Sequence, residues 1–344
     1  MTPTASDGVT HPPRSTALFT DRYELTMLSA ALRDGTADRS CAFEVFARRL
    51  PGGRRYGVVA GTGRFLEALT RFRFTDDEVA SVAEFLTDET LDWLRNYRFS
   101  GDVDGYREGE LYFPGSPILS VRGTFAECVI LETLALSIFN HDSAVASAAA
   151  RMVSASDGRP LIEMGSRRAH EEAAVAASRA AYIAGFSATS NLEATRRHGI
   201  PGAGTSAHAF TLLHTDADGP DEAAAFRAQV DALGVGTTLL VDTYDITAGV
   251  ETAVAVAGPE LGGVRIGEQL RRRRQHGRID RPHRQRRIDH RIRRFGETPQ
   301  VARLDGRRMA VRRRLRAGGT GGAGRARYGK HRGHVRVRSG GSGL

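Results

Sequence analysis

The sequence predicts an α/β fold: an N-terminal α/β domain, then an incomplete, irregular α/β barrel, then a tail rich in arginine and glycine. Up to residue 266, short apolar runs alternate with helical patterns, which favours an α/β class. Later runs such as TTLLV at 237–241 are continuously apolar. Such strands are typical of a parallel sheet buried on both faces, as in a barrel.

Charge divides the chain at the same place. Of the 49 lysine and arginine residues, 26 lie at or after position 265, against 5 of the 40 acidic residues. Residues 1–264 therefore carry a net charge of −12 and the last 80 residues carry +21, although the whole chain carries only +9. The tail holds 25 arginines and 14 glycines and shows no sustained helical or strand period. We expect the body to fold and the tail to be disordered.

In the N-terminal part, the periodicity predicts helices and short strands. Residues 15–34 are expected to form a helix that Thr20 or Asp21 is able to cap. A second helix is expected from Ser143 to Ala155, with Asp142 or Ser143 as its N-cap. The expected strands are the alternating segment 41–47, the run 56–60, and two or three strands within 101–123.

From about residue 159, strands and helices alternate. The expected helices are 169–181 and 221–232. The expected strands are 160–165, 182–188, 208–214, 237–241 and 263–266. Polar residues follow or end several of these strands, where barrel folds place their chemistry; they are Glu163, Ser190, His208 and Asp242.

The chain shows no targeting or membrane segment. Residues 1–17 are polar and lack the apolar core of a secretory signal. The apolar stretch 125–140 is interrupted by Glu127 and Glu132 and is too short to span a bilayer. We therefore expect a cytoplasmic protein. Cys41 and Cys128 occur singly in apolar surroundings, so buried free thiols are expected.

Each polar candidate also has an ordinary structural explanation. His208 has apolar neighbours and fits either a catalytic residue or a core histidine with one satisfied ring nitrogen. Arg167 and Arg168 suit an anion, but such a pair also fits a solvated corner. The segment 242–245 fits a metal site, a partner for a histidine, or a simple turn. The residues alone therefore leave the chemistry open.

Six segments, in order along the chain, resemble the nicotinate phosphoribosyltransferase family. The first, LFTDRYELTM at 18–27, is similar to the family's N-terminal TDxYxxTM signature. The others are FEVF at 43–46, EMGSRRA at 163–169, GFSATSN at 185–191, GTSAHAF at 204–210 and VDTYD at 241–245. Together they cover about residues 16–266, and six ordered matches are far more specific than one.

The resemblance implies an N-terminal α/β domain packed on an irregular α/β barrel. It implies that nicotinate displaces pyrophosphate from 5-phosphoribosyl 1-diphosphate, giving nicotinate mononucleotide in the first step of NAD synthesis from nicotinic acid. ATP hydrolysis would be coupled through a phosphorylated histidine, and Mg²⁺ would neutralise the leaving pyrophosphate. A homodimer is implied as well, because the family's site borrows residues across a subunit interface.

The resemblance also assigns roles to individual residues. His208 would be the phosphorylated histidine, and Asp242 would orient its other ring nitrogen. Tyr23 would stack on the nicotinate ring from the neighbouring subunit, and Arg265 would pair with the nicotinate carboxylate. The remaining substrate-binding residues would be Asp21 in the signature, Arg167 at the phosphoribosyl donor and Ser190 in the pyridine pocket. The metal ligands stay unassigned.

The resemblance ends at Ile266. The family continues there with an Asp-Ser-Gly-Asp-Leu segment, whereas this chain continues with GEQL and an arginine run. An eight-unit barrel needs about 200 to 250 residues, so we expect about half a barrel and little or no turnover. The expected organisation is a disordered segment 1–15, an N-terminal domain 16–141, the first part of the barrel 142–266 and a non-homologous tail 267–344.

We interpret the tail as the family's C-terminal coding region translated out of frame, because resemblance, charge balance and periodicity are lost at one residue. A rival interpretation makes the tail a basic segment that binds nucleic acid by neutralising phosphates. A third possibility keeps the enzyme class but changes the substrate to another pyridine, nicotinamide or quinolinate.

The out-of-frame interpretation makes a direct prediction about the gene. Shifting the reading frame near codon 267 is expected to restore an Asp-Ser-Gly-Asp-Leu segment, and sequencing the gene checks this. If neither alternative frame encodes that segment, the interpretation is wrong.

Overall fold

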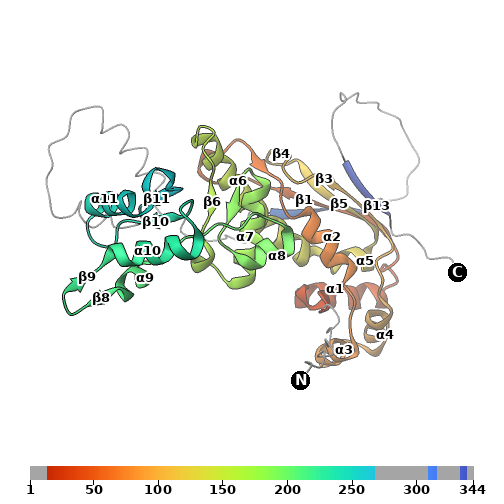
Figure 1. The fold of residues 1–344 in the computed structure, drawn as a ribbon. Coiled ribbons are helices and arrows are strands. Elements are labelled where there is room, and N and C mark those ends of the chain that lie inside the picture. The colour runs from red at the N-terminus through yellow and green to blue at the C-terminus, as the bar shows by residue number, and fades with distance from the viewer. Residues whose placement is uncertain (1–13, 268–308, 316–333, 339–344) are drawn as a thin grey trace, which may run out of the picture. The chain divides into compact units, whose positions relative to one another are not determined.

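The computed structural model describes residues 14–267 and, as backbone, two further strands at 309–315 and 334–338 (Figure 1). The chain divides into two compact units: residues 1–202 with 301–344, and residues 203–300. Each contains helices and strands, so the predicted α/β class is confirmed. Residues 1–13, most of the segment expected to be disordered, lie outside the described residues, and the predicted domain limits stay a prediction.

The first unit is built on a five-stranded antiparallel sheet in the order β12-β1-β5-β3-β13. Its centre consists of β1 (Ser40–Ala47), β5 (Pro117–Thr124) and β3 (Asp102–Tyr106). Alternate residues of β1 are buried, the two-residue period that the sequence showed. A separate antiparallel pair joins β2 (Gly57–Val58) to β4 (Leu111–Tyr112). The strands β1 to β5 lie where strands were expected.

The tail supplies both edge strands of this sheet, so the expectation of a disordered tail does not hold for these two segments. β12 (Met309–Leu315) pairs with β1, and β13 (His334–Arg338) pairs with β3. The sequence HVRVR of β13 alternates valine with basic residues, as strands do. The open edges of β1 and β3 offer unpaired backbone groups that such a segment satisfies. The rest of the tail lies outside the described residues.

Eight α-helices lie within residues 14–202 of the first unit. In chain order they are α1 (Arg22–Arg33), α2 (Thr62–Thr70), α3 (Asp76–Val82), α4 (Asp88–Asn96), α5 (Phe125–Val129), α6 (Glu132–Ala155), α7 (Glu171–Ile183) and α8 (Leu192–His198). Asp21 is the N-cap of α1, as predicted. The largest fully buried side chains of this unit include Phe65, Phe72 and Phe139, which lie in one core with the sheet.

The predicted start of a helix at Ser143 was wrong, because α6 begins at Glu132 and runs through that position. Asp142 does not cap the helix; its carboxylate is bound by Arg64 instead. The stretch Phe125–Ala155 is long and apolar enough to cross a membrane by length and composition, yet 56% of its most apolar window is buried within the protein. Its apolar residues pack in the core, as in a core helix of a soluble protein.

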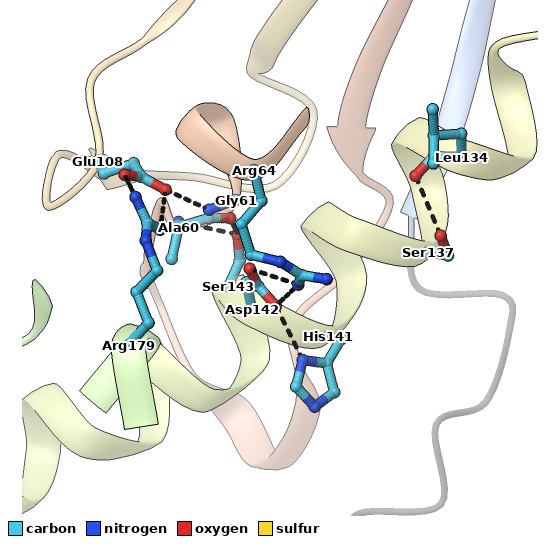
Figure 2. Close-up of polar contacts among 10 residues, drawn as sticks. All are labelled: Ala60, Gly61, Arg64, Glu108, Leu134, Ser137, His141, Asp142, Ser143 and Arg179. Carbon is cyan, nitrogen blue, oxygen red and sulfur yellow. Dashed lines mark hydrogen bonds and ion pairs between the residues drawn. The ribbon is translucent and has the colours of Figure 1, made fainter. Parts of the chain in front are cut away.

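Two ion pairs join α2, α6, α7 and the segment after β3 (Figure 2). Arg64 Nη1 donates to both carboxylate oxygens of Asp142, at 2.8 and 2.9 Å, and the Asp142 side chain is only 1% exposed. Arg179 donates from two nitrogens to the two oxygens of Glu108, at 2.7 and 2.6 Å. Glu108 also accepts the N–H of Gly61, whose φ of 110° favours glycine. Charge-assisted contacts thus hold α7 to the start of α2.

The later part of the body contains two β-α-β units with parallel strands, as a barrel requires. In the first of these β-α-β motifs, β6 (Ile162–Glu163) and β7 (Ala188–Thr189) flank α7. In the second, β10 (Thr238–Leu240) and β11 (Gly263–Arg265) flank α11 (Ile246–Ala257). The second compact unit of the chain also holds α9 (His208–Leu213), α10 (Glu222–Leu233) and a hairpin of β8 (Thr215–Asp216) with β9 (Gly219–Pro220).

Two predicted strands are wrong or much reduced. Residues 208–214 form helix α9 rather than a strand, with the His214 ring against Phe210, one helical turn earlier, at a centroid distance of 4.9 Å. Within 182–188, the first residues end helix α7 and only Ala188 belongs to a strand. Short apolar runs do not distinguish a strand from a buried helix by periodicity, which explains both errors.

The Glu108–Arg179 pair yields a stability prediction. Burial by itself raises the pKa of Glu108, but the hydrogen bonds and charge of Arg179 and the N–H groups of Gly61 and Gly63 outweigh it, so the pKa ends below its ordinary value. Glu108→Gln leaves the Arg179 guanidinium without its carboxylate and is expected to lower the unfolding free energy by about 2–3 kcal/mol at pH 7. Urea unfolding measures this loss.

The sign of the pH dependence follows from the lowered pKa. The stabilisation is complete above the pKa of glutamate in the unfolded chain and is lost as the pH falls through the lower folded-state value. The gap between wild type and variant should therefore shrink at acid pH. As a matched control, Asp92→Asn removes the exposed Arg95–Asp92 pair and is expected to cost less than about 1 kcal/mol. Equal losses in the two variants would contradict the assigned role.

Candidate functional site

His208 opens helix α9 in the second unit, and its ring lies between a hydroxyl and a carboxylate. Nδ1 is 3.2 Å from the Thr243 hydroxyl, and Nε2 is 3.8 Å from Asp242 Oδ1. The latter distance is beyond a hydrogen bond, so the carboxylate acts on the ring through its charge. The side chain is 40% exposed. An accessible imidazole with its two nitrogens facing different groups suits nucleophilic chemistry.

Asp242 follows strand β10 and is fully buried. Its Oδ2 accepts the N–H of Gly267 at 2.7 Å, and a Cβ on that glycine would come within 3.1 Å of the same oxygen. Its Oδ1, the atom nearer His208, has no hydrogen-bond partner within the described part of the chain. A buried carboxylate oxygen without a donor is costly. Gly267 therefore holds Asp242 Oδ2, while Asp242 Oδ1 is available to accept the N–H of the His208 ring.

Arg265 lies on β11, which pairs in parallel with β10, so Arg265 and Asp242 lie at neighbouring strand ends. Its Nη1 donates to Thr205 Oγ1 at 3.1 Å, and Ser206 O lies at 3.4 Å from the same nitrogen. Among the described residues no carboxylate forms an ion pair with it. A guanidinium held by neutral oxygens keeps its charge available for a planar anion. His208, Asp242 and Arg265 are thus brought together in one unit.

Glu222, at the start of α10, was missed by the sequence reasoning. Its Oε1 is buried without a hydrogen-bond partner in the described structure. Burial and the negative charge of Asp242 raise its pKa. In the sequence it looks like an ordinary acidic residue in the first turn of a helix, which the helix dipole favours, so no local signal separates it from Glu171 or Glu172. Thr205 was missed because its partner, Arg265, is distant in sequence. Thr243 lies within the segment 242–245 that the sequence offered as a possible partner for a histidine, and it contacts His208.

Asp21 and Tyr23 occupy the start of α1 in the first unit. Asp21 caps the helix, and the Tyr23 hydroxyl donates to Glu132 Oε1 at 3.1 Å. Burial of the hydroxyl, followed by the charges of Glu132 and Glu24, raises the pKa of Tyr23. The side chain is nevertheless 42% exposed. Tyr23 therefore presents an aromatic surface whose polar end is anchored.

Arg167 and Ser190 lie where β6 and β7 end. Arg167 belongs to a 3₁₀ turn at Ser166–Arg168, and Asn191 Nδ2 donates to Ser166 Oγ at 3.0 Å. Ser190 N–H donates to the carbonyl oxygen of Glu163 at 2.9 Å. The turn and Ser190 are thereby held beside each other. Glu163, also expected at a strand end, has its carboxylate occupied by Gly165, Ser178 and Thr189, so its role is structural.

Metal binding was left unassigned by the sequence. Within residues 14–267 there is no group of three or more His, Cys, Asp or Glu side chains placed to hold a metal ion.

Comparisons with known proteins give these residues a family context. Residues 18–140 match the family described as the nicotinate phosphoribosyltransferase N-terminal domain. The chain is 72% identical over 252 residues to a nicotinate phosphoribosyltransferase of Mycobacterium tuberculosis, covering 72% of this chain and 56% of that protein. It is 37% identical over 247 residues to a nicotinate phosphoribosyltransferase of Bacillus subtilis, covering 71% and 49%.

The fold agrees with this context. A crystal structure of human nicotinic acid phosphoribosyltransferase aligns with a TM-score of 0.65 and 29% identity, over 83% of this chain and 67% of that one. The chain spans about half the length of the curated relatives it matches. Taken together, the matched N-terminal domain, the identity over the body and the shared fold show that the chain belongs to the nicotinate phosphoribosyltransferase family.

Proposed function

We propose that this protein catalyses the formation of nicotinate mononucleotide from nicotinate and 5-phosphoribosyl 1-diphosphate, with ATP hydrolysis coupled to the reaction. The observation that carries the proposal is the exposed His208 ring, with Thr243 at one nitrogen and Asp242 near the other, in a member of this family. The cytoplasm, where nicotinate is converted to NAD precursors, is the expected location, and a homodimer the expected assembly.

His208 supplies the link to ATP. With Nε2 protonated toward Asp242, Nδ1 keeps its lone pair and attacks the γ-phosphorus of ATP. A bond forms from Nδ1 to phosphorus, the bond to the bridging oxygen breaks, and ADP leaves with that oxygen. The positive charge that develops on the ring is stabilised by Asp242 Oδ1, whose other oxygen Gly267 holds. Water later hydrolyses the phosphohistidine to release phosphate.

Arg265 is proposed to select nicotinate among pyridines, because its charge is available for a carboxylate. Tyr23 would cover the ring, Ser190 would line the pocket, and Arg167 with Asp21 would bind the phosphoribosyl donor. These assignments are supported by exposure of the Tyr23 ring and by the placement of Arg167 beside Ser190.

Mg²⁺ would be held mainly by substrate phosphates, since it usually takes only one or two protein carboxylates. Glu222 would supply one such protein carboxylate, because its buried Oε1 lacks a partner among the described side chains. When bound, Mg²⁺ neutralises charge on the pyrophosphate that leaves. Because the described residues build only two β-α-β units, little or no mononucleotide formation is expected relative to the longer relatives.

The His208 assignment predicts the fate of labelled phosphate. Wild-type protein incubated with ATP labelled at the γ-phosphate is expected to acquire acid-labile, base-stable label, and His208→Asn should remove at least about 99% of it, since no other group replaces the nucleophile. His214→Asn changes the histidine at the other end of α9, whose ring is bonded to Phe210 O, and should keep most of the label. Label persisting in His208→Asn would refute the assignment.

The Arg265 assignment predicts a change in ligand selectivity. Arg265→Gln removes the charge and is expected to weaken nicotinate binding about 10- to 100-fold, the loss of one charge-assisted contact. Calorimetric titration with nicotinate, nicotinamide and quinolinate measures this, and nicotinamide affinity should hardly change. Arg227→Gln, at an exposed arginine of α10, is the matched control. A wild-type preference for nicotinamide or quinolinate would favour a different pyridine phosphoribosyltransferase.

A further inference from the structure

We propose that Cys41 and Cys128 form a redox-modification site, at which a hydroperoxide oxidises the two thiols to a disulfide. They are the only cysteines of the sequence, and both are free and buried, as expected. Cys41 lies on β1 and Cys128 on α5, and helices α2 to α4 and strands β2 to β5 separate them along the chain. This inference stands apart from the proposed function.

The sheet pairing brings the two sulfurs together. Cys41 lies directly opposite Gly123 of β5, and a Cβ added to Gly123 would lie 3.2 Å from Cys128 Sγ. Directly paired positions of antiparallel strands place their Cβ atoms about 4.5–5.5 Å apart on one face. A side chain at position 123 would lie beside Cys41. Because that position is a glycine, the Cys128 sulfur lies next to this space and therefore close to Cys41.

The backbone around the pair is fixed on both sides. The N–H groups of Phe125 and Ala126 in α5 donate to the carbonyls of Arg39 and Ala37, just before β1, at 2.9 and 3.0 Å. Thr124 caps α5 by accepting the N–H of Glu127. These hydrogen bonds attach α5 to the segment that leads into β1, so the two cysteines lie on elements that are held to each other by backbone contacts.

The environment gives the two thiols different roles. The neighbouring Cys128 lowers the pKa of Cys41, and the neighbouring Cys41 raises the pKa of Cys128. The carboxylate of Glu127 is the charged group facing both, and it opposes ionisation of either thiol. Cys41 is also the more exposed of the two. Since the thiolate is the nucleophile, Cys41 reacts first.

The reaction balances with hydrogen peroxide as the oxidant. The Cys41 thiolate attacks one peroxide oxygen, the O–O bond breaks, and protonation of the leaving hydroxide gives Cys41 sulfenic acid and water. The Cys128 sulfur then attacks the Cys41 sulfur, the S–O bond breaks, and a second water leaves with the Cys128 proton. Two thiols are oxidised by two electrons, and one peroxide is reduced to two waters.

The experiment uses the full chain, reduced, freed of reductant and treated with graded hydrogen peroxide. We expect an intact-mass decrease of about 2 Da, a non-reduced peptide joining Cys41 to Cys128, and recovery of both thiols with dithiothreitol. Oxidation should also raise the thermal midpoint by several degrees, because it closes a long loop.

Controls separate folded-state proximity from general thiol reactivity. The same treatment in urea should form the link at least about 10-fold more slowly, because the pairing that aligns the thiols is lost. Gly123→Ala, which places a methyl group against Cys128 Sγ, should slow it in the folded chain, whereas Gly236→Ala, at a glycine with open space around it and no positive φ, should not. Mass increases without the link, a link only between chains, or equal rates in urea would each overturn the proposal.

Discussion

The buried carboxylate of Asp142 is the constraint on which the first unit depends. It lies inside the long, mostly apolar helix α6, and Arg64 from α2 neutralises it. An unpaired charge at this depth would cost several kcal/mol, so the helix fits its place only if α2 lies where Arg64 can reach it. Two serines of the same helix extend the constraint: Ser143 bonds both backbone groups of Ala60, and Ser147 accepts the N–H of Val58. One helix face thereby fixes β2 and the turn into α2.

The sequence pattern predicted the elements that carry a clear local signal, such as an alternation of buried residues or a helix cap. The strand β1 alternates cleanly and α1 carries its own cap at Asp21, so both elements were recognised from sequence, although α1 begins at Arg22 rather than at Ser15. Helix α9 was not, since its six residues are as apolar as a strand and its contacts decide the outcome. The start of α6 failed for a related reason. Asp142 looks like a cap in sequence, but in the fold its carboxylate is bound by Arg64, 78 positions away, and by the adjacent His141.

In the candidate site, too, some features follow from local sequence and others only from contacts in the folded chain. Its predicted members were found through ordered motifs rather than through chemistry visible in single residues, and their roles remain predictions. The structure brings His208 beside Asp242 and gives Arg265 neutral partners, which no spacing rule specifies. Glu222 escaped prediction because its distinguishing property, a buried oxygen without a donor, exists only after β10 and α10 pack together. Burial and long-range pairing are properties of the folded chain.

The two edge strands of the antiparallel sheet have an electrostatic consequence. Backbone pairing places few demands on side chains, so the outer positions of the sheet accept a strongly basic segment as readily as an apolar one. The body carries −12 and the segment from 265 onward carries +21. Strands 309–315 and 334–338 attach two pieces of that basic segment to opposite edges of the first unit's sheet. Attraction between the basic segment and the acidic body weakens as salt is added, because salt screens exposed charges.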